Sequence, residues 1–406
     1  MPSAFETLNE RGFIAQLTHE KEIPELLKNK KIAFYAGFDP TADSLHVGHL
    51  LPIMAMSHLQ RAGHKPIALV GGATAMVADP TGKDEMRAML STEAIDANIV
   101  SIKAQLSRFL DFSAGGAILV NNADWIRPLN YIEFLREIGV HFSVNRMLTA
   151  ECFRQRMEKG LTFYEFNYML LQAYDFLVLN RKYGCLLQVG GDDQWSNILA
   201  GADLIRRKDQ KEAFGMTFNL ITTSSGKKMG KTEKGAVWLD PARTPPYEYF
   251  QFWRNVDDGD VMKFLNFFTY LDAAELSNLA KLKGEGLNEA KKVLAFEATK
   301  IVHGQAEAEK AKKAAESLFE GGGEAGNIPV TEFALNADAT VLDLFLAAKL
   351  ISSKSEGRKL IQQAGLSVNN EPVKSHDTPV TKALSGDKGV VVLRKGKKAY
   401  HHIKLV

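Results

Sequence analysis

Cysteine is scarce in this chain of 406 residues, which contains only Cys152 and Cys185. The two lie far apart and form no C-x-x-C pair, so we expect neither a structural zinc site nor a disulfide framework, and a reducing compartment fits. No apolar run approaches the roughly 18 residues that a membrane-spanning helix needs. The first residues are acidic and polar and lack the apolar stretch of a signal peptide. We therefore expect a cytoplasmic protein without a membrane segment.

A strong excess of charge is also missing, because the net charge of the chain is +2. The charge is uneven, however. Residues 351–406 carry eleven basic and four acidic side chains, a net charge of +7, so the preceding residues sum to −5. A basic end on a mildly acidic body suggests a nucleic-acid contact there. Taken alone, the charge is explained more simply by a solvated surface.

Short apolar runs alternate with helical patterns over the first half of the chain. The runs are Ile32–Phe38, Pro66–Gly72, Gly116–Asn122, Cys185–Gly191 and Met216–Ile221. Continuous apolar strands bounded by turns predict an α/β fold, a Rossmann-like, doubly wound parallel sheet. Ligands bind such sheets at the carboxyl ends of the strands. Polar residues after the first, second and fourth strands are therefore expected around one crevice.

The sequence predicts three domains and a linker. Residues 1–222 are expected to form the sheet domain, with a helical insertion at about 124–183 because the third and fourth strands are widely separated. Residues 223–320 combine a basic loop with helical patterns. The glycine-rich residues 321–329 have the composition of a flexible linker. Residues 330–406 are expected to form a small, basic α+β domain.

The stretch DSLHVGHLLPIM places His46 and His49 where the pattern predicts that a strand gives way to a helix, and three interpretations compete. A zinc pair is disfavoured, because a third ligand and the usual H-E-x-x-H spacing are missing. A packed turn at Gly48 explains the short motif alone about equally well. A phosphate site is favoured by the exposed N–H groups and positive dipole end of a helix start. The strand end before it supplies Gly37, Thr41, Asp43 and Ser44.

A second loop, KKMGKT at residues 227–232, joins lysines to a glycine-containing turn. Lysines on such a loop would be able to move onto a departing pyrophosphate. An exposed basic loop is the simpler explanation of this segment taken alone. The stretch GGATAMVADPTGKDE is not a P-loop, because Val77 and Asp84 stand where that motif needs glycine and serine or threonine.

The stretch NYMLLQAYDF carries a polar stripe on a helix that is otherwise apolar. Tyr168, Gln172 and Asp175 fall at positions i, i+4 and i+7, on one face. A half-buried structural helix is the competing explanation. A buried polar stripe costs stability unless a partner meets it, and a zwitterionic amino acid is such a partner.

Together these segments resemble the class I aminoacyl-tRNA synthetases, and among them the bacterial tyrosyl-tRNA synthetase family. The likeness runs nearly end to end, through YAGFDPTADSLHVGH, NYMLLQAYDF, GGDDQWSN and KMGKT. Leu350–Asn370 resembles the S4-type RNA-binding domain that ends these enzymes. The resemblance implies a tyrosine–tRNA ligase that activates L-tyrosine with ATP to tyrosyl-adenylate and pyrophosphate and then transfers tyrosine to the 3′ end of tRNA(Tyr). It also implies Mg²⁺ bound with ATP, no protein-bound metal, and a homodimer, for which the helical insertion is the expected surface.

The resemblance further implies roles for individual residues. Those expected to bind tyrosine are Tyr35 and Asp175 at the phenol, Asp79, Tyr168 and Gln172 at the α-ammonium, and Gln188 and Gln194 near the carboxylate. Those expected to shape the ATP site are Gly37, Asp39, Gly48, Gly191 and Asp193. Those expected to act on the phosphates are Thr41, His46, His49, Lys83, Arg87, Lys228, Lys231 and Thr232, with Lys231 also part of the ATP site.

Two positions depart from the family pattern. KMGKT stands where the class has KMSKS, so one serine is missing and Thr232 replaces the other. Asp192 stands where serine is expected, and its carboxylate would repel an anionic substrate. Two other functions stay open: an HxGH nucleotidylyltransferase that does not use tRNA, and a non-catalytic RNA-binding protein with a synthetase-like body. The basic C-terminal domain argues against the first, and the intact histidine and lysine pairs argue against the second.

Overall fold

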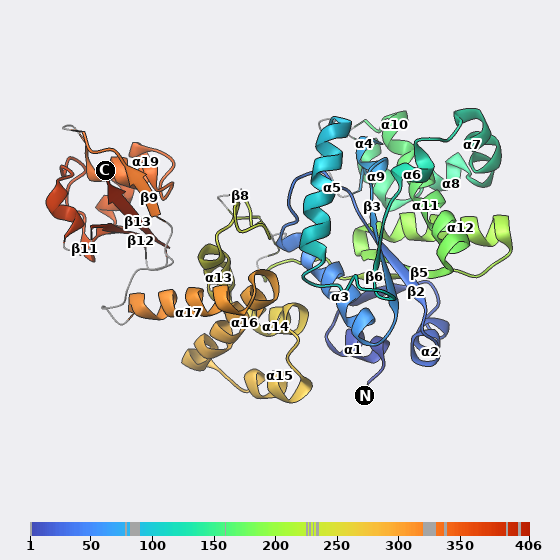
Figure 1. Cartoon of the computed structure of the whole chain (residues 1–406), viewed down its shortest axis with the longest axis horizontal. Coiled ribbons are helices and arrows are strands. Elements are labelled where there is room, and N and C mark those ends of the chain that lie inside the picture. The colour runs from blue at the N-terminus through green and yellow to red at the C-terminus, as the bar shows by residue number, and fades with distance from the viewer. Residues whose placement is uncertain are drawn as a thin grey trace. The chain divides into compact units, whose positions relative to one another are not determined.

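The computed structural model divides into two compact units, which are Met1–Thr244 with Asp257–Ala290, and Pro245–Val256 with Lys291–Val406. Figure 1 shows their helices and strands. The structure describes residues 2–77, 79–81, 90–158, 160–224, 226, 229, 231–232, 235–319, 330–336, 339–386, 389–396 and 399–406. The domain boundaries predicted from the sequence remain predictions, and the predicted linker at 321–329 lies outside the described residues.

A six-stranded sheet with the order β1-β6-β5-β2-β3-β4 forms the centre of the first unit. Five of its strands run parallel, namely β2 (Ala33–Phe38), β3 (Lys65–Val70), β4 (Ile118–Asn121), β5 (Cys185–Gly191) and β6 (Phe214–Phe218). The predicted α/β fold class is thereby confirmed. The edge strand β1 (Ile14–Leu17), which pairs antiparallel with β6, was not predicted. It has four residues, all half-buried, and so lacks the long apolar run that marks the other strands.

The strand order reverses between β2 and β5. From β2 the chain proceeds through β3 to β4 on one side, and after β4 it returns to β5 and β6 on the other side. The two strands at the reversal pair in parallel, with Tyr35 opposite Gln188. A crevice outside the carboxyl ends of these strands is the expected ligand site of such a sheet.

Helices cover the sheet (Figure 1). Those that bear on the crevice are α3 (Leu50–Arg61), α5 (Thr92–Leu106), α11 (Tyr168–Tyr183) and α12 (Trp195–Asp209). Helix α11 packs on α12 and on β5, and Phe176 of α11 lies in the core against Tyr35 of β2. The helix ends at Gly184, which has a φ of +61° and donates its N–H to the Asn180 carbonyl. Glycine adopts this left-handed conformation without a Cβ penalty, so Gly184 sets the end of the helix.

The chain between β4 and β5 is helical throughout its described elements. They are α6 (Ala123–Ile126), α7 (Tyr131–Glu137), α8 (Val144–Leu148), α9 (Glu151–Met157) and α10 (Phe163–Phe166), followed by α11. A buried ion pair fixes α9 to α10, since Arg156 Nη2 lies 2.9 Å from Glu165 Oε1 with both side chains at most 5% exposed. The first unit is completed by α1 (Ala4–Glu10), α2 (Glu22–Asn29), α14 (Val261–Phe268) and α15 (Ala273–Ala280).

The second unit contains α13 (Pro246–Arg254), most of α16 (Leu287–His303), α17 (Gln305–Phe319) and a small α+β domain. The domain's five-stranded sheet has the order β11-β10-β12-β13-β9. Its strands are β9 (Val330–Phe333), β10 (Leu366–Val368), β11 (Glu371–Pro372), β12 (Val391–Lys395) and β13 (Ala399–Leu405). Helices α18 (Val341–Ala347) and α19 (Lys354–Gln362) complete it, and Phe345, Leu366 and Leu393 are fully buried in its core.

Candidate active site

A cavity of about 300 Å³ opens at the carboxyl ends of β2 and β5, where the strand order reverses. Its walls come from β2 and the loop after it, from α11, and from β5 and the turn that follows. The predicted site residues that line it are Tyr35, Gly37, Asp39, Thr41, Gly48, His49, Asp79, Tyr168, Gln172, Asp175, Gln188, Gly191, Asp193 and Gln194. The structure therefore brings the residues predicted for tyrosine, and those predicted for ATP other than Lys231, into one cavity.

The remaining predicted residues fall into three groups. His46 does not line the cavity but stacks on His49, with ring centroids 3.9 Å apart and ring planes inclined by 30°. Lys83, Arg87 and Lys228 lie outside the described residues. For Lys231 and Thr232 the structure describes the backbone, as the two-residue strand β7, which pairs with β8 (Gly235–Ala236).

The floor of the cavity holds a buried carboxylate, Asp175, which is 2% exposed. Trp125 Nε1 donates a hydrogen bond of 2.8 Å to Asp175 Oδ1, and Asn122 Nδ2 donates one of 3.0 Å to Oδ2. Burial raises the pKa of Asp175 to about 7, although these two hydrogen bonds favour the ionised form. Burial and then the charge of Asp175 raise the pKa of Tyr35 well above its ordinary value, so this hydroxyl keeps its proton.

Four buried polar atoms on residues that line the cavity have no hydrogen-bond partner among the described residues. They are Tyr35 Oη, Thr81 Oγ1, Gln172 Oε1 and Gln188 Oε1. A buried polar group without a partner costs free energy, and such groups are rare in folded proteins. A ligand that bears a hydroxyl and hydrogen-bond donors would satisfy them, and a tyrosine with its phenol and α-ammonium has both.

Two further carboxylates, Asp39 and Asp79, line the same cavity. Tyr168 Oη donates a hydrogen bond of 2.9 Å to Asp39 Oδ2. Gln194 Nε2 donates one of 2.8 Å to Asp79 Oδ2. Burial, followed by the charges of Asp39 and Asp79, raises the pKa of Tyr168 well above its ordinary value. This concentration of negative charge suits a cationic group such as an α-ammonium.

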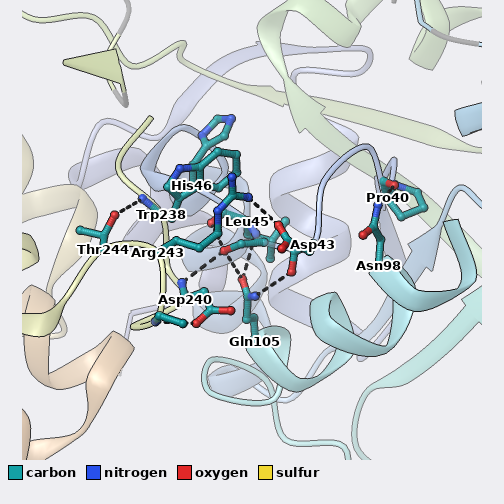
Figure 2. A network of polar contacts seen from close by, with 12 residues as sticks. Pro40, Asp43, Leu45, His46, Asn98, Gln105, Trp238, Asp240, Arg243 and Thr244 are labelled. Atoms are coloured by element: carbon teal, nitrogen blue, oxygen red, sulfur yellow. Dashed lines mark hydrogen bonds and ion pairs between the residues drawn. The ribbon is translucent and has the colours of Figure 1, made fainter. Parts of the chain in front are cut away.

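Figure 2 shows His46, which belongs to the HVGH turn, together with residues around this turn. His46 Nδ1 accepts a hydrogen bond of 3.0 Å from the Gly48 N–H, and His49 Nδ1 accepts one of 3.2 Å from the His46 N–H. An imidazole that accepts at Nδ1 carries its proton on Nε2 when neutral, so each ring presents an Nε2–H donor. A Cβ at residue 48 would lie 2.7 Å from the His46 ring, which gives the turn its own reason for glycine beside access for a base.

The unexpected carboxylate of Asp192 does not line the cavity. Its Oδ1 accepts hydrogen bonds of 2.7 Å from Gln16 Nε2 and from the Thr217 hydroxyl. These donors come from β1 and β6, the strands on the far side of β5. Asp193, its neighbour, lines the cavity. The expected repulsion of an anionic substrate by Asp192 is therefore weakened by two donors that hold this carboxylate.

The sequence analysis missed Asn122, Trp125 and Thr74, which organise the carboxylates. Asn122 Nδ2 donates to Thr74 Oγ1 as well as to Asp175, and Thr74 Oγ1 donates to Asp39 Oδ1, with both of these distances 2.9 Å. Asn122 ends the third predicted strand, so the rule that ligands lie at strand ends would have found it. No comparable signal marks Trp125.

No group of three or more histidine, cysteine, aspartate or glutamate side chains in the described part of the chain is arranged to hold a metal ion. None of the helices described has the length and apolar character that crossing a bilayer requires. The strand-order reversal, the carboxylate-floored cavity and the histidine turn together define a nucleotide-binding α/β enzyme.

Comparisons with known proteins narrow this class. Residues 27–320 match the family of class I tRNA synthetases for tryptophan and tyrosine (W and Y), and residues 323–403 match the tyrosine–tRNA ligase SYY-like C-terminal domain. The tyrosine–tRNA ligase of Acetivibrio thermocellus is 60% identical over the full length of both chains. That of Caldanaerobacter subterraneus subsp. tengcongensis is 59% identical over 99% of both.

A solved structure agrees with these relatives. The C-terminally truncated mitochondrial tyrosyl-tRNA synthetase of Aspergillus nidulans is 31% identical and superimposes with a TM-score of 0.71, over 79% of this chain and 95% of that one. The chain belongs to the tyrosine–tRNA ligases, a family of class I aminoacyl-tRNA synthetases. The resemblance inferred from the sequence motifs is confirmed.

Proposed function

We propose that the cavity between β2 and β5 binds L-tyrosine and ATP, forms tyrosyl-adenylate and pyrophosphate, and passes the tyrosyl group to the 3′ end of tRNA(Tyr). The observation that supports this most strongly is the buried Asp175 carboxylate beside the Tyr35 hydroxyl, which has no partner among the described residues. A phenol is the side-chain group that would meet both. Phenylalanine would leave the Tyr35 hydroxyl without a partner, whereas tyrosine would satisfy it, a difference of about 1–3 kcal/mol.

The first step needs alignment and charge stabilisation rather than a general base. The tyrosine carboxylate is ionised at neutral pH and is itself the nucleophile toward the α-phosphorus of ATP. In our assignment, Asp79, Tyr168 and Gln172 hold the α-ammonium, and Gln188 and Gln194 lie near the carboxylate. This orients the nucleophile toward the histidine turn. The bond from the α-phosphorus to the bridging oxygen then breaks, and pyrophosphate leaves with the electron pair.

Negative charge builds up on the departing pyrophosphate, so hydrogen-bond donors around it lower the barrier. We assign Thr41, His46 and His49 to the phosphates, with Lys83, Arg87, Lys228, Lys231 and Thr232 completing the group. Gly37, Asp39, Gly48, Gly191 and Asp193 shape the ATP site. We assign Mg²⁺ to the triphosphate, which it accompanies as substrate.

The second unit provides the tRNA contact in this proposal. Lys354, Arg358 and Lys359 are exposed on α19, within the basic C-terminal domain. Lysine and arginine contacts to phosphates position a nucleic acid and weaken with salt. The combined change Arg358→Gln and Lys359→Gln should raise the KM for tRNA in aminoacylation and leave pyrophosphate exchange unchanged. The exposed Lys28→Gln is the control in the first unit.

Since ATP and tRNA are cytoplasmic, we place the enzyme in the cytoplasm.

We also propose a homodimer that forms through the helical insertion. Exposed apolar side chains gather in this segment: Tyr131, Ile132, Val140, Val144, Met157 and Phe163. Burial of such a patch favours association. Val140 and Val100 are both 71% exposed, but Val100 lies on α5 outside the insertion. Val140→Asp should therefore shift sedimentation toward the monomer, whereas Val100→Asp should leave it unchanged. An unaltered oligomer in both variants would reject this surface.

The activity itself is tested by exchange of labelled pyrophosphate into ATP. Exchange should require tyrosine, should not occur with phenylalanine or tryptophan, and should be lost in His46→Ala. His376→Ala is the matched control, because this half-exposed histidine pairs with Asp377 in the C-terminal domain. Exchange that proceeds equally with phenylalanine, or survives His46→Ala, would refute the assignment of this cavity.

A further inference from the structure

The segment Val237–Leu239, which follows the KMGKT loop, pairs directly with the turn that carries His46 and His49. The Val47 N–H donates a hydrogen bond of 2.9 Å to the Val237 carbonyl, and the Leu239 N–H donates one of 2.8 Å to the Leu45 carbonyl. Val237 and Leu239 are buried, at 6% and 0% exposed. This segment begins where β8 ends, and β8 pairs with Lys231–Thr232. The backbone therefore connects the HVGH turn to the KMGKT loop through a short buried pairing.

Four side chains, His49, His46, Trp238 and Arg243, form a stack beside this pairing. Figure 2 shows the last three of them. The His46 ring stacks on His49 on one side and meets the Trp238 ring edge-to-face, with centroids 5.8 Å apart and planes at 72°. The Arg243 guanidinium lies 3.7 Å from the centroid of the Trp238 ring. Arg243 also forms an ion pair with Asp43, which lies three residues before His46. The first turn and the later segment thus touch at two places, through His46 and Trp238 and through Asp43 and Arg243.

Helix α5 supports the first turn from behind. Gln105, which is 5% exposed, accepts a hydrogen bond of 2.9 Å from the Leu45 N–H, and Asn98 Nδ2 donates one of 2.9 Å to the Pro40 carbonyl. The two residues are seven positions apart and so lie on one face of the helix. This support fixes the backbone of the turn. The His46 ring is held separately, by the Gly48 N–H and by its ring neighbours His49 and Trp238.

We propose that Trp238 is a positioning residue for pyrophosphate release, because it orients the His46 ring and couples the turn to the loop that carries Lys231 and Thr232. This inference rests on the proposed function of the cavity. Arg243 and Asp43 hold the indole against the ring. Their side chains are 36% and 62% exposed, and such exposed pairs contribute little to folding stability. Arg243 and Asp43 therefore affect the position of the indole rather than the stability of the fold.

The first experiment compares Trp238→Ala with Trp238→Phe in tyrosine-dependent pyrophosphate exchange by the full-length protein. Trp238→Ala should lower kcat by about 30- to 100-fold, because small misplacements of a group that acts in the transition state have effects of this size. Equilibrium binding of tyrosine should change less than about twofold, since the transition-state contact is separate from the tyrosine pocket. Trp238→Phe keeps an aromatic edge beside His46 and should recover most of kcat.

The second experiment removes His46. The residual rate of tyrosyl-adenylate formation in His46→Ala, measured in single turnover with excess enzyme, should fall by less than about twofold when Trp238→Ala is added, because the indole acts through the missing ring. Equal fractional losses of this rate in both backgrounds would overturn the inference, and so would a parallel loss of tyrosine binding in Trp238→Ala.

A third variant keeps the inference testable if Trp238→Ala fails to fold. Arg243→Met should lower kcat several-fold with tyrosine binding unchanged. Its matched control is Arg61→Met. The Arg61 guanidinium lies 3.5 Å from the centroid of the Tyr270 ring, and neither residue lines the cavity. Arg61→Met should leave kcat unchanged, and equal effects of the two variants would contradict a specific role for Arg243. Absence of tyrosine-dependent exchange in the unaltered protein would instead reject the proposed function.

Discussion

Replacement of Tyr35 by phenylalanine should change stability and specificity in opposite directions. The Tyr35 side chain is 1% exposed, and its hydroxyl has no partner among the described residues. Tyr35→Phe removes this unsatisfied group and keeps the ring that packs on Phe176. The free energy of unfolding of the unliganded protein should therefore stay constant or rise, by up to about 1 kcal/mol.

Activity should respond with the other sign. Loss of one neutral hydrogen bond to the phenol costs about 0.5–1.5 kcal/mol, so kcat/KM for tyrosine should fall roughly 2- to 10-fold. For phenylalanine, kcat/KM should stay about the same, because the Tyr35 hydroxyl is already without a partner in the unliganded protein and this substrate offers it none. The ratio of the two values, measured by pyrophosphate exchange, reports the discrimination directly, and thermal unfolding reports the stability.

Tyr270→Phe is the matched control. The Tyr270 hydroxyl lies 2.7 Å from Ser57 Oγ and thus has a partner. Its removal should lower stability by about 1 kcal/mol and leave the discrimination ratio unchanged. The reasoning is refuted if Tyr35→Phe destabilises the protein as much as this control does, or if it leaves the ratio of tyrosine to phenylalanine unchanged.

Three further predictions concern charges. Because burial raises the pKa of Asp175 from its ordinary range to about 7, the unliganded folded state holds this proton more tightly than the unfolded chain. The stabilisation from this bound proton is then fully present below about pH 4 and is lost as pH rises toward 7. The free energy of unfolding of Asp175→Asn, measured by chemical denaturation, should therefore fall less over that pH range than that of the unaltered protein. Asp192→Ala should lower the unfolding free energy by about 1–3 kcal/mol, since the buried Thr217 hydroxyl and the half-buried Gln16 amide lose their acceptor, while tyrosine-dependent exchange stays unchanged; loss of exchange would place Asp192 in the site. Arg156→Met should destabilise the protein by about 3–5 kcal/mol in denaturant titration by leaving Glu165 as a buried unpaired charge, and Glu165→Leu in the same chain should restore part of it.

The sequence predicted the elements whose signals are local. The apolar runs marked all five parallel strands, because a strand buried on both faces must be continuously apolar. The spacing of Tyr168, Gln172 and Asp175 predicted one helix face, and all three residues line the cavity. Helical periodicity alone was sufficient for that result.

Features that depend on contacts between distant segments escaped the sequence analysis. The direction of the Asp192 carboxylate depends on β1 and β6, which are far from it along the chain. The hydrogen bonds from Trp125 and Asn122 to Asp175 require the chain between β4 and α11 to fold back over the pocket. The pairing of Leu45–Val47 with Val237–Leu239 has no local pattern, since each segment is only a short apolar stretch.

The carboxylate beneath the pocket has a consequence for ligand-linked stability. Asp175 is buried and held by two N–H groups in the unliganded protein. Burial of this carboxylate lowers the free energy of unfolding before any substrate binds. A phenol recovers part of that amount on binding, whereas a plain benzene ring recovers none. At equal ligand concentration, tyrosine should therefore raise the melting temperature more than a ring without a hydroxyl, and unfolding would report selectivity in the absence of ATP or turnover.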